Sequence, residues 1–176
     1  MPELQRLRPD HAPAVLAFEH ANRAFFAASV PDRGDDFFAN YPARHAALLA
    51  EQEAGVCHFH VLVESGEILG RFNLMDATAG TAELGFRLAE TATGRGLATT
   101  AVHRLFDLCA ESYGLTTLTA RAALTNTGSR AVLTRTGFLE TGEQVELNGK
   151  RGLAYVRELG AAVASGPGVR DGRLPS

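Results

Sequence analysis

Residues 83–99, which read ELGFRLAETATGRGLAT, are the most informative stretch of this 176-residue chain. The first six residues predict the end of a β-strand, and an amphipathic helix is predicted to begin at Leu97. Glycines at 94 and 96 let the backbone approach a ligand closely. Because a helix N-terminus has unpaired N–H groups and partial positive charge, it favours a phosphate. The stretch predicts a phosphate-binding loop, but a glycine turn that merely starts a helix would share this pattern.

A second motif, NTGSRAVLTRTGF, occupies residues 126–138. Asn126 or Ser129 can cap a helix that Gly137 ends, and this interpretation is purely structural. The motif gains meaning from its position, because it follows the glycine loop after one further helix and strand.

The two motifs, in this order, resemble the acetyl-CoA elements of the GNAT superfamily of acyl-CoA N-acyltransferases. In that superfamily a strand precedes Arg/Gln-x-x-Gly-x-Gly/Ala, and an Asn-x-x-Ser…Gly-Phe element lies downstream. This chain departs at Thr93, which stands at the Arg/Gln position, and at Glu90, where proline is frequent. Segments 4–10 and 22–31 look most like the RimJ/RimL-type protein N-terminal acetyltransferases.

The resemblance implies which residues bind acetyl-CoA, the expected co-substrate. In the family the strand backbone pairs with the pantetheine amides, the loop holds the pyrophosphate, and the asparagine bonds to the pantetheine. Carried over to this sequence, the cofactor-binding residues are Phe86, Arg87, Leu88, Thr93, Gly94, Arg95, Gly96, Leu97, Ala98, Thr99, Asn126 and Ser129.

The resemblance also suggests catalytic groups. Ser129 stands at the position proposed as general acid in RimL-like enzymes, near the sulfur. Glu83, just before the pantetheine strand, and Glu146, roughly at the position of the RimL-like base, are alternative general bases. Either carboxylate can equally be a solvated strand residue. No metal is expected, because His58 and His60 alternate along a strand without further ligands at a recognised spacing.

The expected fold is α/β (α+β) of the GNAT type. It has a central, mostly antiparallel mixed sheet that is splayed at the acetyl-CoA site and flanked by helices. A first helix is predicted after a cap at Asp10, and further helices over 42–53, 97–113 and 129–136. Strands are predicted over 56–64, 67–74, 81–88, 115–122, 138–141 and 152–159.

Composition indicates an ordinary globular protein. Residues 1–159 are expected to form one domain, and the small, polar residues 160–176 a flexible C-terminal tail. A net charge of −3 gives no basic footprint for nucleic acid. No apolar run approaches the ~18 residues of a membrane span, and the N-terminus lacks the apolar core of a signal peptide. Cys57 and Cys109 fit small buried hydrophobes, so a cytoplasmic protein is expected.

The predicted reaction is acetyl transfer from acetyl-CoA to a primary amine, by direct attack in a ternary complex. The expected acceptor is a protein or peptide N-terminus. A small-molecule amine, such as an antibiotic or polyamine, is the alternative acceptor. A CoA-binding module without catalysis is the alternative function. A homodimer stays an open alternative.

Overall fold

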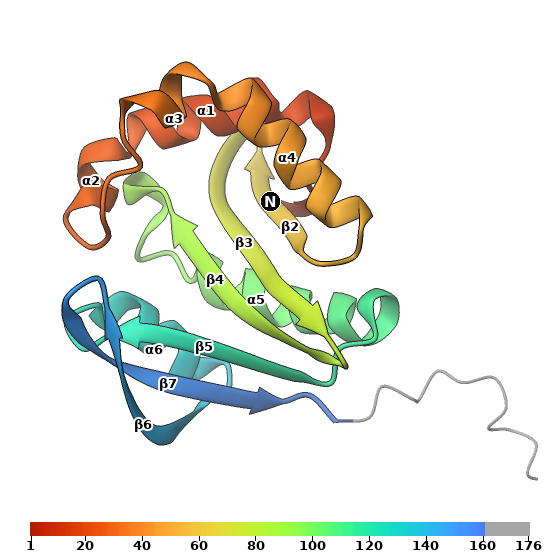
Figure 1. Cartoon of the computed structure of the whole chain (residues 1–176), viewed down its shortest axis with the longest axis vertical. Coiled ribbons are helices and arrows are strands. Elements are labelled where there is room, and N and C mark those ends of the chain that lie inside the picture. The colour runs from red at the N-terminus through yellow and green to blue at the C-terminus, as the bar shows by residue number, and fades with distance from the viewer. Residues whose placement is uncertain (161–176) are drawn as a thin grey trace, which may run out of the picture.

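The computed structural model describes residues 1–160, which form a seven-stranded sheet with helices on both faces (Figure 1). The strand order is β1-β2-β3-β4-β5-β7-β6, and every neighbouring pair is antiparallel except β4 and β5. This confirms the expected mixed, mostly antiparallel sheet. The tail expected from residue 160 lies almost entirely outside the described residues. The strands are β1 (Glu3–Arg6), β2 (His58–Glu64), β3 (Glu67–Thr78), β4 (Thr81–Leu88), β5 (Thr117–Ala123), β6 (Leu139–Leu147) and β7 (Lys150–Glu158).

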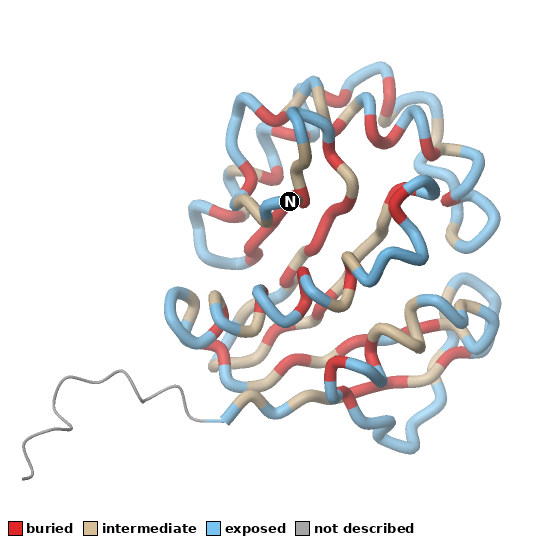
Figure 2. Tube along the Cα trace, turned by 180° about the vertical axis from the view of Figure 1, so that it is seen from behind, coloured by how far each residue is buried: buried red, intermediate tan, exposed pale blue. Residues whose placement is uncertain are grey.

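Two hydrophobic clusters, one on each face of the sheet, hold the helices in place. One face carries α1 (Ala12–Ala21), α2 (Arg23–Ala27), α3 (Asp35–Ala39) and α4 (Tyr41–Glu53). The other carries α5 (Leu97–Leu108), which buries Ala98, Ala101, Val102 and Leu105 at helical spacing. The last helix, α6 (Thr127–Arg135), follows β5. Figure 2 shows the buried segments concentrated along the inner strands.

The pairing between β4 and β5 is short. Only residues 81–83 of β4 pair with 117–119 of β5, and beyond Glu83 the two strands separate. Meanwhile β4 stays paired to β3 as far as Leu88, and β5 stays paired to β7 as far as Ala123. The sheet is therefore splayed into a wedge whose apex lies at Glu83 (Figure 1). A splay at this strand was expected.

The start of the chain differs from the sequence-based expectation. The prediction that Asp10 caps the first helix is wrong. Its carboxylate instead pairs with Arg8, 2.9 Å from Nε, inside a short 3₁₀ turn. Helix α1 begins only at Ala12, with Pro13 in its first turn. Strand β1 and helix α3 were not predicted.

Several element ends also shift. The helix predicted over 97–113 is α-helical only to Leu108 and continues as a π-helical turn over Cys109–Tyr113. Strand β6 runs to Leu147 instead of residue 141, because it pairs with β7 along the hairpin. Within residues 1–160, no helix combines the length and apolarity that a membrane crossing requires.

Candidate active site

The glycine loop between β4 and α5 has the geometry of an anion site. Gly94 and Gly96 adopt left-handed conformations, with φ of 78° and 73°. Helix α5 starts after Gly96 with no side-chain cap, and its first backbone bond runs from the Thr100 N–H to the Gly96 carbonyl. Among the described residues, the six backbone N–H groups of 94–99 therefore have no partner. A Cβ built on either glycine would meet no atom within 4 Å, so both face open space.

The residues that follow β5 form the facing wall. Asn126 precedes α6, and its side-chain Oδ1 accepts the Ser129 backbone N–H at 3.2 Å. This confirms Asn126 as the helix cap. The Ser129 hydroxyl has no hydrogen-bond partner within residues 1–160. The Ser129 backbone N–H therefore bonds to the helix cap, and the Ser129 hydroxyl is left without a bond in the described part of the chain and can contact a ligand.

A single cavity of about 750 Å³ joins these two walls. It lies where β4 and β5 separate, and its size suits a large ligand. Of the residues predicted to bind the cofactor, all but Arg95 line it. The remaining lining residues are Phe25, Phe26, Ser29, Val30, Thr127, Gly128, Ala131, Val132 and Arg135.

Comparison with known proteins agrees with this geometry. A family model described as an acetyltransferase (GNAT) domain matches residues 3–139. The chain belongs to the GNAT acetyltransferase family. The expectation from the two motifs is thereby confirmed.

Individual relatives refine the placement within the GNAT family. Mycobacterium smegmatis RimJ, solved with CoA-disulfide, is 27% identical at a TM-score of 0.78, over 88% of this chain and 80% of that one. The ribosomal-protein-S5-alanine acetyltransferase of Vibrio fischeri has the same fold, with a TM-score of 0.83 at 19% identity, covering 90% and 93% of the two chains. An uncharacterized N-acetyltransferase of Bacillus licheniformis, p20, is 33% identical over 87 residues. That match spans 48% of this chain and about half (49%) of the relative.

Three predicted site residues lie outside the cavity lining. The Arg95 side chain points towards Glu64, with Nη2 3.6 Å from Oε1. The Glu83 carboxylate accepts a 2.7 Å bond from Arg121 Nε, at the apex of the wedge. Glu146 is exposed on β6, opposite Arg151 of β7. Of the two candidate bases, Glu83 is the one next to the splayed strands.

Sequence reasoning missed most of the α2 and α6 lining. Phe25 and Phe26 both line the cavity, although Phe26 is also buried. Ser29 and Val30 carry no motif. Thr127 and Gly128 lie inside the Asn-x-x-Ser element, and this spacing was the one signal that pointed to them.

The histidine pair of β2 has structural partners. His60 is buried: its Nδ1 lies 3.2 Å from the Phe72 carbonyl, and its Nε2 lies 2.6 Å from the Tyr113 hydroxyl. Burial lowers the pKa of His60 to about 4. His58 stacks on the Tyr113 ring at 3.9 Å. Among the described residues, no three His, Cys, Asp or Glu side chains gather as metal ligands.

Both cysteines are buried and free, as predicted. Burial raises the pKa of the Cys109 thiol to about 12, which keeps it protonated and poorly nucleophilic. Neither cysteine lines the cavity. A covalent acyl-cysteine route therefore has no support from the site.

Proposed function

We propose that this GNAT protein transfers an acetyl group from acetyl-CoA to the primary amine of a protein or peptide N-terminus. The observation that best supports this proposal is the single cavity, which joins the unpaired N–H groups of the glycine loop to the Ser129 hydroxyl. Acetyl-CoA supplies the thioester acetyl group when bound. The residues fit it, because the two glycines leave an open backbone cradle and the splayed strand offers a free edge.

The chain's own groups have distinct tasks in this proposal. The N–H groups of residues 94–99 hold the pyrophosphate, and the β4 edge aligns the pantetheine. The amine nitrogen bonds to the acetyl carbonyl carbon, the carbon–sulfur bond breaks, and CoA leaves as the thiol. Glu83, directly or through water, takes a proton from the ammonium. After attack the Ser129 hydroxyl gives its proton to the departing sulfur, and the surplus proton on the attacking nitrogen restores that hydroxyl. Holding both reactants in one cavity supplies much of the acceleration.

The acceptor assignment rests on the relatives. RimJ and the ribosomal-protein-S5-alanine acetyltransferase are both similar over most of the chain. The proposal places the reaction in the cytoplasm, where ribosomal proteins are made. The alternative acceptors are antibiotics and polyamines.

A thiol-release assay with acetyl-CoA tests the proposal. The panel contains peptides with free and acetylated N-termini, a polyamine and an aminoglycoside. We expect turnover with free N-termini and none with the blocked peptides. If only the polyamine or the aminoglycoside is acetylated, the acceptor is a small-molecule amine and not a peptide N-terminus. Acetyl-CoA binding without turnover on any amine would leave a CoA-binding module instead of an enzyme.

A further inference from the structure

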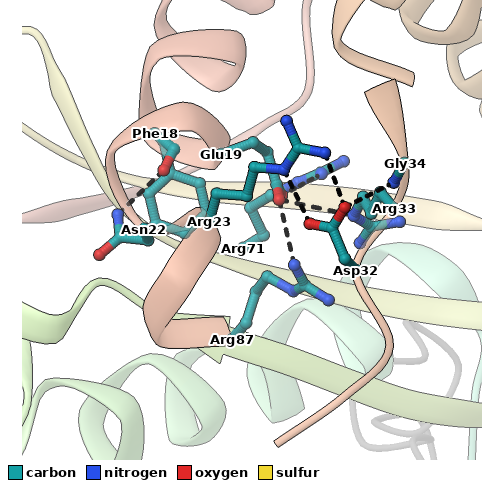
Figure 3. A network of polar contacts seen from close by, with 9 residues as sticks. All are labelled: Phe18, Glu19, Asn22, Arg23, Asp32, Arg33, Gly34, Arg71 and Arg87. Carbon is teal, nitrogen blue, oxygen red and sulfur yellow. Dashed lines mark hydrogen bonds and ion pairs between the residues drawn. The ribbon is translucent and has the colours of Figure 1, made fainter. Parts of the chain in front are cut away.

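A buried carboxylate contacts three arginines from different parts of the chain (Figure 3). Glu19 of α1 has a side chain only 1% exposed. Its Oε2 accepts a 2.8 Å bond from Arg71 of β3, and its Oε1 accepts a 3.0 Å bond from Arg87 of β4. Arg33, from the segment between α2 and α3, places Nε 3.5 Å from the same Oε1.

The charges in this group do not balance. One carboxylate faces three guanidinium groups. Asp32 and Asp35 both bind Arg23, at 2.7 and 2.8 Å, so these four arginines and three carboxylates together keep one surplus positive charge. Charge withdrawn from water without a partner is costly. An additional anion at this group would offset the surplus charge.

The electrostatics of the arginines agree with this imbalance. Burial, followed by the charge of Arg33, lowers the pKa of Arg87 to about 10. Burial also lowers the pKa of Arg33, against the opposing effect of Glu19. Both guanidinium groups remain protonated at neutral pH, and a negative charge beside them would stabilise this charged form.

One of the three arginines, Arg87, lines the main cavity. Arg87 and Phe26 line that cavity, and the same two residues line a narrow recess of about 10 Å³ next to it. The other charged residues that line the recess are Glu19, Arg23, Asp32 and Arg33. A volume of this size admits about one water-sized group, such as a single oxygen of a carboxylate whose remaining atoms lie in the main cavity. The Arg33 and Arg87 side chains are 33% and 21% exposed, and within residues 1–160 no hydrogen bond involves the terminal nitrogens of Arg33.

The group faces away from the phosphate loop. Side chains alternate between the two faces of a strand. Phe86 packs in the cluster of α5, whereas its neighbour Arg87 reaches Glu19 of α1. The helix N-terminus that would hold the pyrophosphate belongs to α5. The surplus charge is therefore on the opposite face of β4 and is not part of the pyrophosphate site.

We propose that Arg33 and Arg87 bind a carboxylate of the acceptor, carried close to its reactive amine. The inference rests on the proposed acetyl transfer and narrows its substrate class. A planar guanidinium binds a carboxylate through two parallel N–H donors. Two sources supply this chemistry: an acidic side chain just after a peptide N-terminus, or the terminal carboxylate of a very short peptide.

Matched peptides test the proposal. Ala-Glu-Ala-Ala-amide and Ala-Gln-Ala-Ala-amide differ by one charge, and Ala-Ala and its C-terminal amide test the second source. We expect kcat/KM to favour the carboxylate member of one pair by about tenfold, mainly through KM, as a charged hydrogen bond provides. Equal kcat/KM within both pairs would overturn the proposal.

Variants connect the preference to the arginines. Arg33→Gln should reduce the carboxylate preference about tenfold, to near unity. Arg104→Gln, which removes a charge from the exposed side of α5, is the control and should retain it. If Arg33→Gln does not fold by circular dichroism, Arg33→Lys takes its place, and a partial loss is expected because the lysine keeps the charge without the paired donors. A preference unchanged in a folded Arg33 variant rejects the assignment.

Binding without turnover separates the two proposals. Calorimetry of the same peptides with the CoA-saturated protein reports carboxylate recognition whether or not acetyl transfer occurs. A carboxylate preference in Kd that Arg33→Gln abolishes, with no turnover, supports the arginine site and rejects acetyl transfer. Turnover with no preference in Kd or KM rejects the arginine site and leaves acetyl transfer intact.

Discussion

At the scale of single residues, Asn126 and Ser129 divide two tasks at the start of α6. The Asn126 side chain accepts the Ser129 backbone N–H, and alanine at position 129 would keep that bond. The helix cap and the hydroxyl can therefore be tested separately. The sequence alone did not decide which residue caps the helix, because both Asn126 and Ser129 are suitable cap residues.

Ser129→Ala should lower kcat at least about tenfold while acetyl-CoA affinity and thermal stability change little. The variant removes only a hydroxyl that contacts the leaving group in the proposed transition state. Steady-state kinetics, calorimetry and thermal unfolding measure the three quantities. Thr134→Ala, which removes an exposed hydroxyl from the same helix, is the control. A loss of stability with unchanged kcat would leave Ser129 with a structural role alone.

Glu83→Gln should reduce kcat/KM more at pH 7 than at pH 9, by up to about a hundredfold at the lower pH. A peptide amine with a pKa near ~8 is largely protonated at pH 7, so a base helps most there. Glutamine keeps the size of the side chain and a hydrogen-bonding partner for Arg121. Glu146→Gln, on the exposed hairpin, should show the smaller pH-dependent loss. Wild-type kcat/KM across this range would exclude Glu83 as the base.

His60 should make the protein less stable as the pH falls from 6.5 to 4. Its pKa is about 4 in the folded state, below the ordinary value of 6.5. The unfolded chain therefore binds more protons in that window, and the free energy of unfolding falls with pH by about 3 kcal/mol. Above pH 6.5 this contribution is constant. Urea unfolding measures the slope.

His60→Leu should flatten this slope, whatever its effect on absolute stability. His103→Gln, on the exposed side of α5, should leave the slope unchanged. A wild-type slope in His60→Leu would assign the acid sensitivity to other groups.

At the scale of elements, the segment from β4 through the glycine loop to α5 was predictable. Its signals are local: the bounds of β4, the left-handed glycines and the apolar spacing of α5 all come from neighbours along the chain. The cofactor wall followed from this segment and from the Asn126 motif. Each of these features depends on fewer than about 15 consecutive residues.

Sequence analysis did not predict the features that depend on residues far away along the chain. Strand β1 has only four residues, without alternation of burial, and exists because it pairs with β2. Helix α3 is five residues long, too short for a periodic pattern. The arginine group combines Glu19 with Arg71 and Arg87, which lie 52 and 68 residues further along the chain. No pattern of neighbouring residues in the sequence predicts such a contact.

Gly96→Val should abolish acetyl-CoA binding. The left-handed φ of 73° disfavours valine, and its side chain would project into the open space of the loop. Gly55→Val is a matched control, because Gly55 has φ of 77°, also meets no atom within 4 Å, and lies outside the cavity lining. Calorimetry should show binding lost only in Gly96→Val, with similar destabilisation of both variants. Unchanged affinity in folded Gly96→Val would refute the loop assignment.

At the scale of the whole molecule, the wedge separates two parts of one sheet. Strands β1–β4 with α1–α4 lie on one side, and β5–β7 with α6 on the other, as Figure 1 shows. Three residue pairs between β4 and β5 join them in the sheet, and α5 packs in the cluster that contains residues from both sides. A ligand in the cavity would contact both parts at once, since residues from α2, β4 and α6 line it.

Acetyl-CoA should raise the melting temperature by about 5–10 °C at a concentration near a hundred times its Kd. Because the chain has no tryptophan, scanning calorimetry is the suitable measurement. A mixture of pantetheine and adenosine 3′,5′-bisphosphate at the same concentrations should produce a smaller shift, since neither spans the wedge. Equal shifts in melting temperature would show that a ligand spanning both parts of the sheet adds no stability beyond that of its two fragments.

The separation of β4 from β5 also has a consequence for self-association. Residues 84–88 of β4 present a free sheet edge in the interior of the molecule. Such an edge normally invites a strand from another chain and so begins aggregation. Here the wedge closes at Glu83, and residues of α2 and α6 wall its open end. A foreign strand, whose side chains project on both faces, has to pass between these walls to reach the edge. The shape of the wedge thus protects this edge from aggregation.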